Sequence, residues 1–223
     1  MAIARFKDLV LDALDSPRLG AFWGQVLDLE WHAQDDGDGW LSGRTPEHTI
    51  WINQVPEPIT VKSRVHFDIY TTSLSALEEL GAQIVEPFPR WTVMTDPEGI
   101  QFCAFLRDEL PQDRLHGLVV DSADPAAIGW WWAGIYDAPV EVHSEGWATI
   151  EKVPSMPILT MDFNAVPEPK TVKNRIHWDV GVAELQPLLD AGANLLRPRD
   201  EEISWHVLAD PAGNEFCAFV DGE

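Results

Sequence analysis

The stretch VPEPITVKSRVHFD (residues 55–68) returns as VPEPKTVKNRIHWD (residues 166–179), and this repetition decides the fold. Ten of the fourteen positions are identical, and His66 and His177 lie 111 residues apart. The similarity extends outward, because WTVMTDPEGIQFCAF (91–105) pairs with WHVLADPAGNEFCAF (205–219). The chain is therefore a tandem duplication. We predict one domain over 1–108 and a second over 113–223, joined by a short polar segment.

Length and composition agree with two compact soluble domains of about 100 residues each. The formal net charge is −22, with 15 basic against 37 acidic residues, which argues against nucleic-acid binding because phosphate contacts need a surplus of Lys and Arg. No apolar run approaches the roughly 20 residues of a membrane span, and the N-terminal segment lacks a signal-peptide pattern. We expect a cytoplasmic acidic protein with neither nucleic-acid nor membrane partners.

Each repeat reads as the element order β-α-β-β-β written twice, which predicts an α+β fold. An opening strand (6–12 or 115–121) leads into a helix, for which we predict Ser16 and Asp124 as N-caps, each followed by a proline. Strands are expected near 40–43 and 49–54, then at 91–95 and 101–106, with counterparts in the second repeat.

The quoted stretch combines a linker with the start of a strand. Its Val-Pro-Glu-Pro segment cannot lie in a central strand, because proline lacks the N–H donor. Beyond it polar and apolar residues alternate: Lys62, Arg64, His66 and Asp68 share one face, and Val61, Val65, Phe67 and Ile69 share the other. Since helices must cover the apolar face, the polar row is expected to face water or a cavity.

With these elements the chain resembles the glyoxalase / bleomycin-resistance / extradiol-dioxygenase superfamily, also called vicinal oxygen chelate proteins, and most closely its glyoxalase-like domain branch. The residues that carry the resemblance are LHGLVVDSADPAAIGWWW (115–132), NRIHWDVGVAEL (174–185) and DPAGNEFCAF (210–219). The resemblance implies tandem domains, each of two βαβββ modules whose mixed sheet curls into a cup with helices on its convex face. In that superfamily, polar residues on the concave face bind a metal, a substrate or a drug.

The resemblance also implies positions for metal ligands. Carried over, they fall on His116, Asp162, His177 and Cys217 in the C-terminal domain, and on Lys7, Trp51, His66 and Cys103 in the N-terminal one. Protonated lysine and tryptophan do not ligate metals, so only the C-terminal set is expected to hold a divalent ion such as Zn, Fe, Mn or Ni. Cys217 stands where the family has glutamate, which leaves the family's enzymology open.

Several of these residues also have a purely structural interpretation. His66 and His177 can fix a strand to a loop, and Cys103 and Cys217 stand between apolar neighbours, as small buried cysteines do. Arg64 and Arg175 could neutralise an anionic ligand or pair with acidic side chains within the protein.

Aromatic residues suggest the ligand. The chain has 11 tryptophans, most of them expected in the core, but Trp51 falls at a concave position where an aromatic wall suits a planar or cationic molecule. The leading hypothesis is binding of a small organic molecule, and the candidate ligand-binding residues are Trp51, Arg64, His66, Asp68, Trp91, Arg175, Asp179 and Trp205.

Two further hypotheses remain open. One is a metal-dependent lyase, isomerase or dioxygenase acting in the C-terminal domain. The other is a structural or partner-binding duplication, which predicts a large exposed apolar patch and no ligand-sized cavity. The chain is expected either as a monomer whose domains pair internally or as a homodimer.

Overall fold

The computed structural model describes residues 1–222 and contains four βαβββ modules, two in each repeat. Module 1 comprises β1 (Ala4–Ala13), α1 (Ser16–Leu27), β2 (Glu30–Ala33), β3 (Gly39–Ser42) and β4 (Ile50–Gln54), with a 3₁₀ turn, η1 (Pro46–His48), before β4. Module 2 comprises β5 (Val65–Thr71), α2 (Leu74–Glu79), β6 (Gln83–Pro87), β7 (Thr92–Thr95) and β8 (Gln101–Leu106).

The second repeat has the same order. Module 3 comprises β9 (Leu115–Ser122), α3 (Pro125–Tyr136), β10 (Val140–Val142), β11 (Ala148–Glu151) and β12 (Thr160–Ala165). Module 4 comprises β13 (Ile176–Val182), α4 (Gln186–Asp190), β14 (Asn194–Arg197), β15 (His206–Ala209) and β16 (Glu215–Val220). The α+β class and the tandem architecture expected from the sequence are confirmed.

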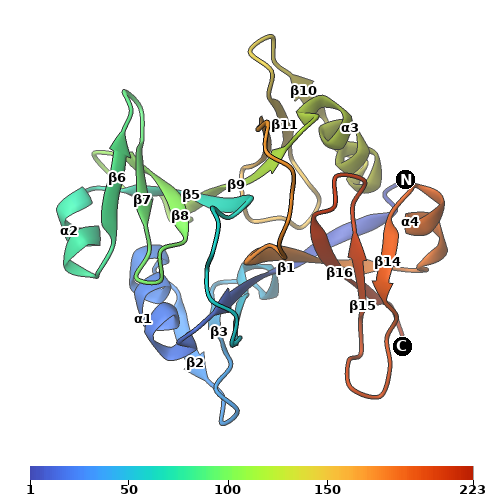
Figure 1. The fold of residues 1–223 in the computed structure, drawn as a ribbon, viewed down its shortest axis with the longest axis horizontal. Helices are drawn as coiled ribbons and strands as arrows, with labels where there is room; N and C mark the ends of the chain where they lie inside the picture. Colours follow the sequence, from blue (N-terminus) through green and yellow to red (C-terminus); the bar gives the residue numbers. More distant parts are fainter. Residues whose placement is uncertain (223) are drawn as a thin grey trace.

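The two sheets do not follow the two repeats. One sheet has the order β14-β15-β16-β13-β1-β4-β3-β2, so it joins modules 4 and 1, and the other has the order β10-β11-β12-β9-β5-β8-β7-β6, which joins modules 3 and 2 (Figure 1). At the centre of each, an antiparallel strand pair crosses between repeats: β1 with β13, and β5 with β9. We name the sheets β1/β13 and β5/β9 after these pairs.

The hydrophobic core is continuous across both repeats, and within each repeat it is organised around one long helix. In the first, Trp23 of α1 packs edge-on against Phe67 of β5 and Phe102 of β8, with ring centroids 5.3 and 5.2 Å apart. In the second, Trp132 of α3 makes the equivalent contacts with Trp178 and Phe216. Each long helix therefore ties the strands of its own module to those of the next, although these strands belong to different sheets.

Local sequence explains how the long helices begin and end. Asp124 caps α3 by accepting a hydrogen bond from the Ala127 amide, as predicted. In α1 the N-cap is Asp15, which accepts from the Arg18 amide, and the expected cap Ser16 is instead the first helical residue. Both helices end at an aspartate in the left-handed region, Asp28 and Asp137.

The two Val-Pro-Glu-Pro linkers face one another at the middle of the molecule, between the sheets (Figure 1). The Arg64 guanidinium donates to the Glu168 carbonyl of the opposite linker, and Arg175 donates to the Glu57 carbonyl. The Lys62 ammonium reaches Asp121 of β9, and Lys173 reaches Asp12 of β1. The two lysines therefore pair with acidic side chains, whereas the two arginines bond to backbone carbonyl groups and not to the acidic side chains that one expected alternative named.

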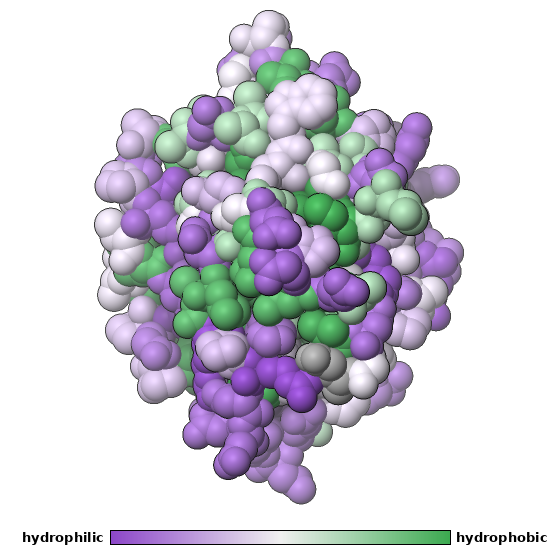
Figure 2. Space-filling view, turned by 90° about the vertical axis from the view of Figure 1, so that its right-hand side faces the viewer, coloured by the Kyte–Doolittle hydropathy of each residue, from purple (hydrophilic) through white to green (hydrophobic). Residues whose placement is uncertain are grey.

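The surface mixes apolar and charged residues. Figure 2 shows the side that carries α4, β14 and β15, where green apolar areas are interrupted by purple hydrophilic residues. Leu195 and Leu196 of the edge strand β14 are 42% and 55% exposed. Within residues 1–222, no helix is long and apolar enough to cross a membrane.

Candidate functional site

Each sheet has one face free of helices, and polar side chains gather there. On the β1/β13 sheet this face, which we call cup 1, carries His177 and Asp179 of β13 and Cys217 of β16. On the β5/β9 sheet the corresponding face, cup 2, carries His66, Asp68 and Cys103. The strand alternation predicted from the sequence produces both sets, because Val65, Phe67 and Ile69 point into the core instead.

In cup 1, three potential metal-ligand atoms converge. The His177 Nε2 atom lies 3.6 Å from the Cys217 Sγ atom and 3.9 Å from the Asp179 Oδ1 atom. All three residues are buried, and within residues 1–222 neither His177 Nδ1 nor Asp179 Oδ1 has a hydrogen-bond partner. Burial lowers the pKa of His177 to about 3 and, together with the nearby Asp8 carboxylate, raises the pKa of Asp179 well above its usual value.

Cup 2 holds the same triad. The His66 Nε2 atom lies 3.6 Å from both the Cys103 Sγ atom and the Asp68 Oδ1 atom. Burial lowers the pKa of His66 to about 4. Burial, reinforced by the Asp162 charge, raises the pKa of Asp68 to about 7, and burial also raises the pKa of the Cys103 thiol. Both triad histidines are therefore uncharged near neutral pH, and burial opposes ionisation of the neighbouring carboxyl groups.

The donor atoms fit a transition metal. Zinc binds nitrogen at about 2.0–2.1 Å and thiolate sulfur at about 2.3 Å, so the N–S edge of a tetrahedron around it measures about 3.6 Å. The His–Cys separations in both cups have this value. The unpartnered Oδ1 atoms of Asp68 and Asp179 also face their histidines, so the three side chains of each triad suit a divalent ion.

The surroundings of the two triads differ. In cup 1 the neighbouring carboxylate is Asp8, whose Oδ2 atom accepts from the Lys7 ammonium at 2.6 Å and from the Trp51 indole at 3.3 Å. In cup 2 the residue equivalent to Asp8 is Gly117, and Asp162 takes the place of Trp51. The carboxylate of Asp162 accepts hydrogen bonds from two threonine hydroxyls, those of Thr149 and Thr160. The position equivalent to Lys7 is His116 in cup 2, so no lysine at this position competes with a bound cation for the carboxylates there.

Aromatic side chains flank both triads. In cup 1, Trp40 lies between His32 and Trp51 in a cross-strand row, and Trp205 packs on Phe219 on the other side. In cup 2, Trp91 lies between Phe88 and Phe105 on one side, and the rings of His143 and Trp147 stack on the other. Of these rings, sequence reasoning singled out Trp51, Trp91 and Trp205. It missed the others because their hairpins carry no conspicuous motif.

The predicted metal set does not form one site. His116 and Asp162 lie on the β5/β9 sheet, whereas His177 and Cys217 lie on the β1/β13 sheet. The prediction assumed that each repeat builds its own cup, but β9 pairs with β5 and β13 pairs with β1, which separates the four residues. The same crossing places Lys7 and Trp51 in cup 1, and His66 and Cys103 in cup 2.

His116 and Lys7 occupy equivalent irregular positions in the first strand of their modules. A register shift falls beside each of them. His116 stacks on Tyr70 with a centroid separation of 4.0 Å, and Lys7 lies 4.2 Å from the Phe219 ring centroid. Both therefore lie among the aromatic residues of a cup, and neither belongs to a triad.

Two further expectations need correction. Arg64 and Arg175 precede their strands, so their guanidinium groups lie at the central linkers and not in the polar rows that contain His66 and His177. The apolar interpretation of the cysteines is incomplete: Cys217 is buried and Cys103 is half-buried, but each thiol also lies 3.6 Å from a histidine nitrogen.

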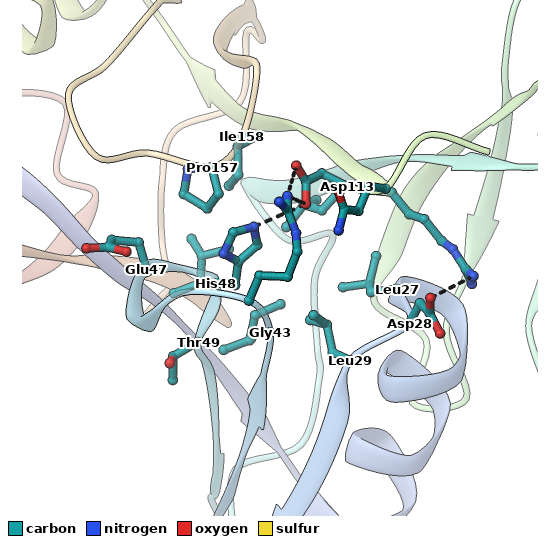
Figure 3. Close-up of a pocket in the computed structure, with 16 residues that line it drawn as sticks. Leu27, Asp28, Leu29, Gly43, Glu47, His48, Thr49, Asp113, Pro157 and Ile158 are labelled. Atoms are coloured by element: carbon teal, nitrogen blue, oxygen red, sulfur yellow. Dashed lines mark hydrogen bonds and ion pairs between the residues drawn. The ribbon is translucent and has the colours of Figure 1, made fainter.

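A smaller pocket of about 140 Å³ lies away from both triads, where the inter-repeat segment packs on module 1 (Figure 3). The Asp113 carboxylate accepts hydrogen bonds there from Arg44, and His48 Nε2 lies 3.1 Å from it. Partial burial opposes ionisation of Asp113, but these two partners outweigh it and lower its pKa. The cluster attaches the start of the second repeat to the first.

The pKa shifts in cup 2 predict opposite pH profiles for two single variants of the metal-free protein. Between about pH 4 and 6.5, His66 and Asp68 together hold one proton in both states: it is on Asp68 in the folded protein and on His66 in the unfolded chain. The two residues together therefore do not make the free energy of unfolding of the native protein depend on pH in this range. Asp68→Asn leaves only the histidine. Its stability relative to native protein should fall as the pH drops from 6.5, by up to about 1.4 kcal/mol per pH unit.

His66→Gln leaves only the carboxyl group, which is protonated in the folded state. Its relative stability should therefore fall as the pH rises across the same window. Urea unfolding at a series of pH values, with chelator present, measures both slopes. Parallel profiles for the two variants would show that the proton does not move between these groups on folding.

Comparison with known proteins agrees with this architecture. The sequence model of the glyoxalase-like domain family matches this chain twice, over residues 8–105 and over residues 117–219. No curated protein matches the chain. Glyoxalase I from Zea mays is 13% identical with a TM-score of 0.71, over 97% of this chain and 92% of that one. A candidate dioxygenase from Bacillus subtilis is 11% identical with a TM-score of 0.64, over 100% and 86% of the two chains.

The cppA protein from Streptococcus pneumoniae is 11% identical, with a TM-score of 0.53 and coverage of 99% and 100%. At these identities the solved structures share the fold alone. The family model, in contrast, covers most of the sequence in two successive matches, which coincide with the two repeats. The chain therefore belongs to the glyoxalase-like domain family, within the vicinal oxygen chelate superfamily, and carries two copies of its domain.

Proposed function

We propose that this protein binds a small organic molecule in its cups. The observation that carries the proposal is the arrangement of aromatic rings on both sides of a buried polar triad, repeated in each cup. Such a combination of apolar walls with a few converging polar groups is typical of small-molecule sites.

The chemistry of the walls favours a planar or cationic molecule. Indole faces attract cations and stack on flat rings. The carboxyl groups of Asp8 and Asp179 in cup 1, and of Asp68 and Asp162 in cup 2, provide acidic partners at the floor. The net charge of −22 adds a general attraction for cations.

Isothermal titration with planar cationic dyes, drugs and metabolites tests this proposal. A ligand of cup 1 should lose about tenfold in affinity on Trp51→Ala, because the variant removes one aromatic wall. Trp130→Ala is the matched control, since Trp130 is 62% exposed on α3, and it should leave the affinity unchanged. Absence of heat with every compound, or equal loss in the two variants, would overturn the assignment.

A second candidate function is metal-dependent catalysis, and the His-Asp-Cys triads favour it. Glyoxalase I and the candidate dioxygenase among the fold relatives are enzymes of the kind that this reading predicts. A bound divalent ion would supply Lewis-acid polarisation of substrate oxygens. His66, Asp68 and Cys103 would hold it in cup 2, and His177, Asp179 and Cys217 in cup 1.

The chain's own residues favour cup 2 for this role. The Lys7 ammonium beside Asp8 opposes a second positive charge in cup 1. In cup 2, Asp162 is oriented by its two threonine partners and adds a negative charge next to Asp68. This version differs from a site confined to the C-terminal domain, because His66, Asp68 and Cys103 all come from the first repeat.

Zinc titration of chelator-treated protein should therefore reveal two affinities per chain. His66→Ala should abolish the tighter site and His177→Ala the weaker one, each lowering the affinity of its own site at least about 100-fold through loss of a ligand. Each variant serves as the control for the other, and elemental analysis of the dialysed proteins gives the stoichiometry. The same loss in both variants, or no zinc bound to native protein, would sink the metal assignment.

A further inference from the structure

A wide cavity lies outside both cups. It measures about 1150 Å³ and is lined by the two Val-Pro-Glu-Pro linkers. Figure 1 shows these linkers at the middle of the molecule. Its lining is symmetric, since residues 55–64 and 166–175 contribute equally, together with the equivalent residues Asp12 and Asp121. Ligand pockets commonly measure about 300–1000 Å³, so the cavity has room for an organic molecule and water.

Basic residues are concentrated there. Five of the chain's 15 Lys and Arg residues line the cavity, although the protein as a whole is strongly acidic. Three of the five are neutralised: Lys62 pairs with Asp121, Lys173 with Asp12, and Lys170 with Glu215. The paired Asp12 and Asp121 are almost fully buried, so these lysines are committed to them.

The two arginines, unlike the lysines, are not neutralised by a carboxylate in the part of the chain that the structure describes. Arg64 and Arg175 donate to backbone carbonyl groups, which are dipoles without net charge. Across residues 1–222, no carboxylate forms an ion pair with either guanidinium, although the exposed Glu57 and Glu168 also line the cavity. A guanidinium group has five N–H donors, and one carbonyl uses few of them. Each arginine therefore keeps donors and charge for a further acceptor.

The walls between the arginines are largely apolar. Proline, valine and isoleucine of both linkers provide them, and Val61 and Val172 are each about half exposed toward solvent. Prolines reduce the conformational freedom of the linkers, which keeps the cavity open at little entropic cost. The cavity thus combines an apolar surface with one guanidinium group from each repeat, Arg64 and Arg175.

We propose that this central cavity binds an organic dianion with an apolar body, such as an α,ω-dicarboxylic acid. One carboxylate pairs with Arg64 and the other with Arg175, in the two-pronged geometry that guanidinium groups favour. This site shares no triad residue with the cups and takes the opposite charge of ligand, so it is separate from the proposed function there.

Isothermal titration of the full chain with octanedioic, dodecanedioic and hexadecanedioic acids tests the proposal. One diacid should bind per chain, and at least about tenfold more tightly than the monocarboxylic acid of the same length. Arg64→Gln and Arg175→Gln should each lower the affinity at least about tenfold, with Arg18→Gln on the exposed face of α1 as the matched control. Trp51→Ala and His177→Ala should leave diacid binding unchanged.

The arginines also tie the linkers together, so a second pair of variants leaves their carbonyl bonds intact. Val61→Glu and Val172→Glu place a negative charge in the cavity and should abolish diacid binding, whereas Val61→Gln should retain most of it. No saturable binding by native protein, equal affinity for diacid and monoacid, or unchanged binding in the glutamate variants would overturn the proposal.

Discussion

A chain cut between its two repeats will remain one particle in native buffer. A protease site placed in the exposed segment 108–112 separates the repeats covalently, but the two sheets still connect them. The β1 strand pairs with β13 from Ala4 to Leu11, and β5 pairs with β9 from Val65 to Ile69. The fragments should therefore co-elute at the size of the intact chain, with a dissociation constant below about 1 µM, as in obligate interfaces.

Gel filtration with and without denaturant measures this outcome. The uncut chain is the size control, and the fragments should separate only when urea unfolds both sheets. Two independent domains joined by a tether would instead separate on cleavage at neutral pH. That result would contradict the crossing of the sheets, which is the feature that decides the composition of both cups.

The same crossing marks the limit of what the sequence could reveal. Periodicity identified the strands and most of their buried faces, since Val65, Phe67 and Ile69 are buried as predicted. Val61, which was predicted on the same face, precedes β5 and is 47% exposed. The partner of β1 was not identifiable in this way. The strands VHFDIYT (65–71) and IHWDVGV (176–182) have the same pattern, so either could pair with β1, and only the long-range topology selects the second.

This ambiguity carried over to the candidate sites. His177 and Cys217 were predicted to lie together and do so, because β13 and β16 are neighbours within one module. His116 and Asp162 were grouped with them only by position along the chain. The triad partners Asp68 and Asp179 follow their histidines by two residues on the same strand face, so strand alternation could have found them as metal ligands.

Local signals failed where two residues compete for one role. Asp15 and Ser16 are both good N-cap residues, and the structure uses the aspartate. The short edge strands β2, β6, β10 and β14 were not located, because three to five residues give little periodicity. These errors moved element ends by a residue or left an edge strand out, but they did not change which side chains lie at the triads.

Replacing Trp132 with alanine will destabilise the protein more than any other change within the sequence Trp130-Trp131-Trp132. The Trp132 side chain is fully buried, with ring centroids 5.0 Å from those of Trp178 and Phe216. Its indole N–H also donates to the buried Asp210 carboxylate at 3.1 Å. The variant leaves a large cavity and removes one hydrogen bond from a buried carboxylate, so the free energy of unfolding should fall by about 3–5 kcal/mol.

The neighbouring tryptophans provide graded controls. Trp130 is 62% exposed, and Trp130→Ala should change the free energy of unfolding by less than about 0.5 kcal/mol. Trp131 is partly buried and donates to the Ala191 carbonyl at 2.7 Å, so its variant should fall between the two. Urea unfolding gives all three values. Equal losses of unfolding free energy at the three positions would mean that α3 does not pack one face against β13 and β16. Modules 3 and 4 would then be held together by contacts other than those of Trp132.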